Sequence, residues 1–105
     1  MLLLSPVASA REDCAALAKR IDANVIGLHP PLEGRSAKDR NTPRYSAPAA
    51  HCRVTQRPVQ ADVYLTIHAT YNGWLQVGFV DSAGEDHIVW VKEADVRIGP
   101  PLGPK

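Results

Sequence analysis

The stretch YNGWLQVGFV, residues 71–80, decides the fold of this chain of 105 residues. The dipeptide Asn72-Gly73 is typical of tight β-hairpin turns, because both positions readily adopt positive φ. After the turn, large apolar residues alternate with small or polar ones, which is the period of a half-buried strand. The inward-facing residues of this strand should be Leu75, Val77 and Phe79. Trp74 falls on the opposite face, so something other than the strand's own core must cover it, or it is displayed.

The segments on either side of this stretch have the same period of two. In DVYLTIHATY, the inward set is Val63, Leu65, Ile67, Ala69 and Tyr71, and the outward set is Tyr64, Thr66, His68 and Thr70. After a second turn, DSAGED, the segment HIVWVKEADVRI places Val89 and Val91 inward and Trp90 outward. Residues 52–60 offer one more strand, which Pro58 puts at an edge or bend. These short strands with close turns predict a mainly β fold, a small antiparallel barrel.

The stretch YNGWLQVGF…GEDHIVWVKEADVRI resembles the C-terminal half of bacterial SH3-like (SH3b) domains. Gly73-Trp74 and Val89-Trp90-Val91 occupy the places of two tryptophan motifs, and residues 93–96 occupy the closing helical turn. RYSAPAAHC is similar to an arm that leads to a cysteine in exported proteobacterial relatives. The resemblance covers residues 45–98 and implies an SH3-like barrel, assigned here to residues 51–99. It also implies a groove of the kind in which such folds hold extended peptides or protein loops.

The first ten residues, MLLLSPVASA, predict export. A leucine run followed by Ala8-Ser9-Ala10 is typical of the end of a secretory signal, so residues 1–10 are interpreted as a signal-peptide remnant. A short hydrophobic N-terminus is the alternative. An exported domain with two cysteines most simply pairs them, which predicts a Cys14–Cys52 disulfide; two buried free thiols are the other interpretation.

The remaining segments flank the predicted barrel. Residues 12–24 have an apolar face at helical spacing, which predicts a helix within the segment 11–28, and Cys14 on that face would tether it. Residues 29–50 are rich in turn formers and lack an apolar period, which predicts a basic Pro-rich loop. Residues 100–105 predict a flexible tail.

Composition and motifs argue against several functions. The 12 Lys and Arg residues are balanced by 11 Asp and Glu, which does not favour nucleic-acid binding. No apolar run reaches the roughly 18 residues of a membrane span. No catalytic motif is present, and the histidines show no metal-ligand spacing, so we expect no enzyme activity, no metal and no cofactor. The four histidines are His29, His51, His68 and His87.

The remaining candidates for a functional site are side chains on the predicted surface. Tyr64, His68, Trp74 and Trp90 share the outward parity, so they could line a shallow partner-binding groove. The alternative is that the N-terminal helix and the loop 29–50 cover this face. Residues 35–57 are distinctly basic, and Arg40 and Arg44 are candidates for docking an acidic partner, unless the segment is simply a solvated loop.

Together these features predict a periplasmic or secreted protein that acts by binding. The leading hypothesis is an immunity or inhibitor protein that blocks a cell-wall-directed toxin or hydrolase. The alternatives are a peptidoglycan-binding SH3-like module and an accessory subunit of a periplasmic enzyme.

Overall fold

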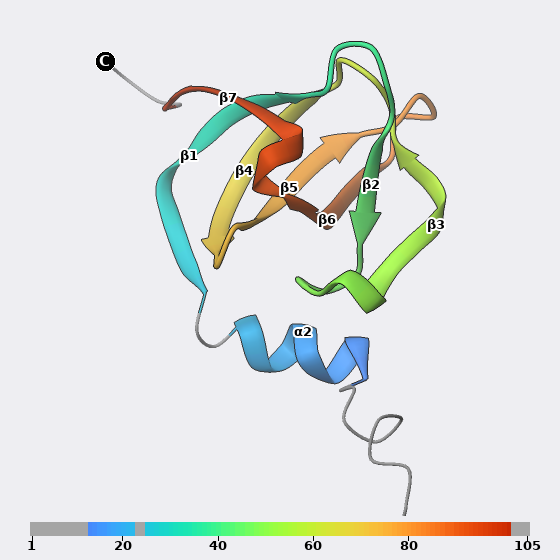
Figure 1. The fold of residues 1–105 in the computed structure, drawn as a ribbon. Coiled ribbons are helices and arrows are strands. Elements are labelled where there is room, and N and C mark those ends of the chain that lie inside the picture. The colour runs from blue at the N-terminus through green and yellow to red at the C-terminus, as the bar shows by residue number, and fades with distance from the viewer. Residues whose placement is uncertain (1–12, 23–24, 102–105) are drawn as a thin grey trace, which may run out of the picture.

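Seven antiparallel strands form one sheet in the order β3-β2-β6-β5-β4-β1-β7. In the computed structural model, which describes residues 13–22 and 25–101, the sheet curls into a half-barrel with a short helix beneath it (Figure 1). The predicted mainly β fold with a tethered N-terminal helix is confirmed. The elements are α2 (Cys14–Asp22), β1 (Ile26–Ser36), β2 (Thr42–Tyr45), η1 (Ala50–Cys52), β3 (Arg53–Val59), β4 (Tyr64–Tyr71), β5 (Trp74–Val80), β6 (Asp86–Lys92), η2 (Glu93–Asp95) and β7 (Val96–Pro101).

The central hairpins form as the alternation predicts. Asn72 and Gly73 make the β4–β5 turn with φ of 45° and 83°. The inward residues of β4, β5 and β6 are buried and make the barrel core together with a valine at the end of β3. This core consists of Val59, Leu65, Ile67, Leu75, Val77, Val89 and Val91.

One irregularity in the β4–β5 ladder changes which side chains face the core. The pairing shifts by one residue at His68, so β4 carries one more residue than β5 at that point. Because side chains alternate along a strand, an inserted residue reverses the facing of those after it. Tyr71 therefore pairs with Trp74 and packs beside it in the cluster on the outer face. The prediction that Tyr71 faces the barrel core is wrong for this reason.

The segment 29–50 is not a loop, because it supplies most of β1 and all of β2. β1 pairs with β4 on one side and with β7 on the other, which gives it stability that its own sequence does not signal. Its two prolines, Pro30 and Pro31, lie where the β1–β4 register shifts, so their missing N–H groups break no regular ladder.

The other segment boundaries also move. α2 ends at Asp22 and β1 begins at Ile26, so the predicted helical segment 11–28 is too long. The predicted tail starts inside β7, which extends to Pro101. The signal-peptide interpretation of residues 1–10 lies outside the described residues.

A polar network fastens β1 to the 60–63 turn. The buried Ser36 hydroxyl donates to the Gln60 carbonyl at 2.6 Å and accepts from the Val63 N–H at 2.8 Å. Arg97 of β7 then donates to the Ser36 carbonyl at 2.8 Å and to the Asp62 carboxylate at 2.7 Å. β1, the turn and β7 are thus joined through side chains as well as through the ladder.

Asp62 should make the stability of the protein depend on pH in the acid range. The hydrogen bond from Arg97 lowers the pKa of the Asp62 carboxyl, and the charge of Arg35 acts in the same direction. A carboxyl with a depressed folded-state pKa stabilises the fold above the unfolded-state pKa and loses that contribution as pH falls through the folded-state pKa. Asp62→Asn should therefore lower the free energy of unfolding at neutral pH, and the two stability curves should converge as pH falls below about 4.

Denaturant titrations across a pH series would measure this convergence. Asp39→Asn is the matched control, because Asp39 sits in an exposed pair with Arg40 at 3.7 Å. Wild-type and Asp62→Asn curves that run parallel from neutral to acid pH would contradict the role given to Asp62.

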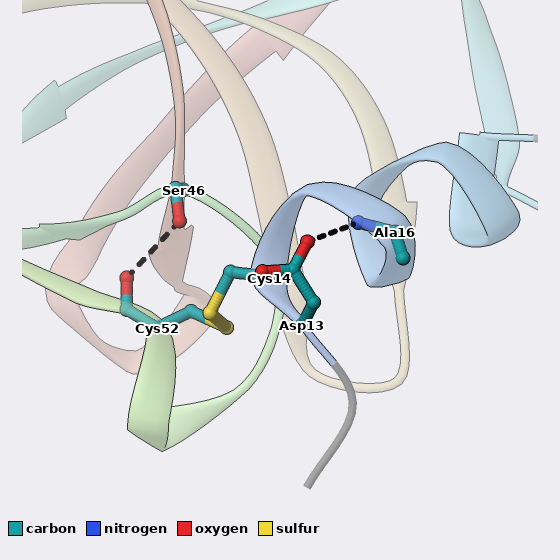
Figure 2. Close-up of a disulfide and its surroundings, with 5 residues drawn as sticks. All are labelled: Asp13, Cys14, Ala16, Ser46 and Cys52. Atoms are coloured by element: carbon teal, nitrogen blue, oxygen red, sulfur yellow. Dashed lines mark hydrogen bonds between the residues drawn. A yellow bond between two sulfur atoms is a disulfide. The ribbon is translucent and has the colours of Figure 1, made fainter.

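A second apolar cluster lies between α2 and the outer face of the sheet. Leu17 and Ile21 of α2 are buried in it. Asp13 caps the helix by accepting a hydrogen bond from the Ala16 N–H at 3.2 Å (Figure 2). The predicted Cys14–Cys52 disulfide is present, and it attaches the first turn of α2 to η1 (Figure 2).

We expect this disulfide to provide a large part of the stability of the fold. It closes a separation of 38 residues, for which the chain-entropy model gives about 4 kcal/mol. The double substitution Cys14→Ser and Cys52→Ser should lower the free energy of unfolding by about this amount in chemical denaturation. Reductant should have the same effect on the wild type and none on the variant. Equal stability of wild type and variant would contradict the tethering role.

Candidate functional site

The structure does not bring the side chains of the predicted aromatic surface together on one exposed face. Trp90 is only 3% exposed and packs in the cluster with Leu17 and Ile21 of α2. Trp74 is half-buried and meets Tyr45 edge-on, with ring centroids 4.7 Å apart. The protein's own helix therefore covers this face. The prediction that Trp90 is displayed for a partner is wrong, because the tethered helix occupies the space above it.

Tyr64 and His68 do not join the tryptophans in a common groove. Tyr64 is 43% exposed at the start of β4, whereas Trp74 pairs with the last residue of that strand. His68 is half-buried and lies over Gly78, with its Nε2 2.9 Å from the place where a Cβ would stand. The ring of His68 thus fills the space that Gly78 leaves.

The two tryptophans should differ strongly in their contribution to stability. Trp90→Ala removes a buried ring and should lower the free energy of unfolding by about 3–5 kcal/mol. Trp74→Ala removes a half-buried ring and should cost less. Chemical denaturation of both variants measures the difference. A larger loss for Trp74→Ala than for Trp90→Ala would contradict the assignment of Trp90 to the helix-covered cluster.

A pocket of about 430 Å³ opens at the end of the half-barrel remote from α2. Figure 1 shows α2 below the barrel and the 81–85 turn on the opposite side. The pocket forms where β2 and β6 begin and β3 and β5 end. Its lining residues are Asn41, Arg44, Arg57, Pro58, Gln60, Val63, Phe79, Val80, Asp81, Ser82, Ala83, Glu85 and His87. Phe79 and Val63 also pack against the barrel core, so the pocket floor is the end of that core.

The β5–β6 turn forms one wall of the pocket and is braced internally. His87 stacks on Phe79 with ring centroids 5.1 Å apart, and its Nε2 lies 2.7 Å from Asp81 Oδ2. Asp81 Oδ1 accepts the backbone N–H groups of Ala83 and Glu85, each at 2.9 Å. The Glu85 hydrogen bond first, and then the His87 contact, lower the pKa of the Asp81 carboxyl.

The same three side chains have the composition of a metal site. Ligand atoms of Asp81, Glu85 and His87 lie within 4.8 Å of one another, although the histidines show no metal-ligand spacing in the sequence. Both oxygens of Asp81 are already engaged, one by His87 and one by backbone N–H groups. These hydrogen bonds hold the β5–β6 turn in shape.

Two arginines form the opposite wall. Arg44 donates from Nε to the Gln56 carbonyl at 3.2 Å, across the irregular β2–β3 pairing. Arg57 has a φ of 52°, a left-handed conformation that is unfavourable for a long side chain such as that of arginine. Such backbone outliers cluster at functional sites.

These two arginines differ from Arg35 and Arg40 of the same basic segment. Arg35 lies 3.6 Å from the Asp62 carboxylate, and Arg40, a predicted contact residue, pairs with Asp39 away from the pocket. In residues 13–22 and 25–101, no ion pair joins Arg44 or Arg57 to a carboxylate. The structure thus places one predicted site residue, Arg44, at the pocket, together with Arg57, which the sequence did not single out.

Comparison with protein-family models, with curated proteins and with solved structures finds no match. The resemblance to SH3b domains therefore stays a prediction. Within the described ranges, no helix has the length and apolar character that a membrane crossing requires.

Proposed function

We propose that this chain is a non-enzymatic binding protein that blocks another protein, in the manner of an immunity protein or an inhibitor of a toxin or hydrolase. The observation that carries the proposal is the pocket at the barrel end, where Arg44 and Arg57 lie beside an apolar floor and pair with no carboxylate of the described residues. Cations on one side of an apolar floor suit a protein surface that offers acidic and apolar side chains, because opposite charges steer encounter and apolar anchors supply affinity.

The disulfide fits an oxidising compartment outside the cytoplasm. Location in the periplasm or outside the cell is part of the proposal. A barrel core that ends in an open pocket gives such a protein a docking surface.

Binding rather than catalysis is also part of the proposal. A serine nucleophile needs a base within hydrogen-bonding reach, and that base is usually oriented by a third group. Among the residues lining the pocket, His87 bonds to Asp81, and no hydrogen bond links His87 to Ser82. The His87–Asp81 pair braces a turn in this arrangement.

The positions of the aromatic side chains argue against the competing hypothesis of a peptidoglycan-binding module. It relied on Tyr64, Trp74 and Trp90 as a shared aromatic platform. The burial of Trp90 under α2 and the separation of Tyr64 from both tryptophans remove that platform. No observation favours the accessory-subunit hypothesis over the inhibitor.

The proposal is tested by affinity capture followed by inhibition. Immobilised oxidised protein should retain a partner from the extracytoplasmic fraction of the source organism, and the double variant Arg44→Glu, Arg57→Glu should not. The purified partner should lose its activity in proportion to added wild-type protein, with saturation near one equivalent.

Arg53→Glu is the matched control, because Arg53 is an exposed arginine of β3 outside the pocket lining. It should retain the partner. A captured partner that keeps full activity at excess protein would refute the inhibitor function, and so would capture that is equal for wild type and the double pocket variant.

A further inference from the structure

The pocket at the barrel end continues into a second hollow. This hollow, of about 260 Å³, lies beside the start of β4 and the end of β5. It shares four lining residues with the pocket, so the two are parts of one depression, called here the end groove. The shared residues are Val63, Phe79, Val80 and His87. The lining that only the second hollow contributes is Tyr64, Thr66 and Asp86.

The middle of the end groove is apolar and accessible. Val80 is 57% exposed and Tyr64 is 43% exposed, although both are large apolar side chains. Ile88, 64% exposed, lies two residues beyond Asp86 on the same face of β6. Large exposed apolar groups gathered beside a hollow are typical of interaction sites.

The end groove also has a polarity. Arg44 and Arg57 form its cationic end, on β2 and β3. Asp86, the first residue of β6, forms its anionic end in the second hollow, and Glu85 of the β5–β6 turn lies beside it in the lining of the first pocket; both are exposed. In the part of the chain that the structure describes, no ion pair uses either carboxylate. The two ends therefore present opposite charges on either side of an apolar middle.

The end groove must recognise a partner through side-chain contacts. The groove crosses the ends of β3, β4, β5 and β6, not the side of an edge strand. An occupant therefore lies across strand ends, where regular main-chain pairing with the sheet is not available. Arginine pairs strongly with carboxylates, and an aromatic floor favours a large apolar side chain.

We infer that the end groove binds an extended segment of a partner protein with an acidic side chain at one end, large apolar side chains in the middle and a basic side chain at the other end. The inference rests on the proposed function and specifies the chemistry of the partner. Charge complementarity at both ends selects this occupant over a uniformly acidic or uniformly basic one.

A pair of synthetic peptides tests the inference on the full oxidised chain. The first carries two aspartates, a Leu-Phe-Leu centre and two lysines, and the second replaces the charged residues with asparagine and glutamine. Calorimetry should show the charged peptide binding at least tenfold more tightly than the neutral one. NMR shift changes should map to the residues lining the end groove.

Arg57→Gly is the critical variant, because glycine accepts the positive φ at this position and the fold is retained. It should weaken binding of the charged peptide at least fivefold and change binding of the neutral peptide by less than twofold. Arg53→Gln, outside the groove, should bind both peptides like wild type. Raised salt should weaken only the charged peptide.

Several outcomes would overturn the inference: no binding of the charged peptide, equal affinity for both peptides, or a loss in Arg57→Gly that is the same for both. If a captured partner is inhibited while no peptide binds, the groove assignment fails and the proposed function stands. If the peptide binds as expected but no partner is captured and inhibited, the proposed function fails and the groove assignment stands.

Discussion

The structure depends on burying both faces of its central strands. The barrel core covers one face, and α2 covers part of the other, where Trp90 would otherwise contact water. A helix of nine residues is too short to be stable by itself in water, so its position depends on packing and on the Cys14–Cys52 disulfide. Because the helix occupies the tryptophan face, the candidate site is the pocket at the far end of the barrel.

The sequence predicts those parts of the fold whose residues carry a local signal. Alternation identified strands β4 to β6, and Asn72-Gly73 identified the turn between β4 and β5. β1 carries no such signal, since its backbone is held by β4 and β7, which come much later in the chain. The extra residue at His68 was also beyond prediction, because a bulge depends on how two strands pair and not on the composition of either one.

The candidate site was predictable only as a region. The basic segment was visible in the sequence, but the arginines within it differ by tertiary partners: Arg35 meets Asp62, whereas Arg57 meets no carboxylate among the described residues. The alternation correctly placed Trp90 on the face opposite the barrel core, but the expectation that it is exposed was wrong. Alternation tells which face of the sheet a side chain is on, and it does not tell what covers that face.

The two edges of the sheet have a consequence for how the protein behaves among its own copies. β3 bulges away from β2 over residues 55–58, and it contains Pro58 and the left-handed Arg57. β7 ends in Pro100-Pro101. Prolines and bulges leave an edge without a continuous row of N–H donors, which is how natural sheets prevent the addition of further strands. Although the half-barrel is not closed, neither sheet edge offers a regular surface for a strand from another copy. We therefore expect that high protein concentration does not produce fibrils through these edges.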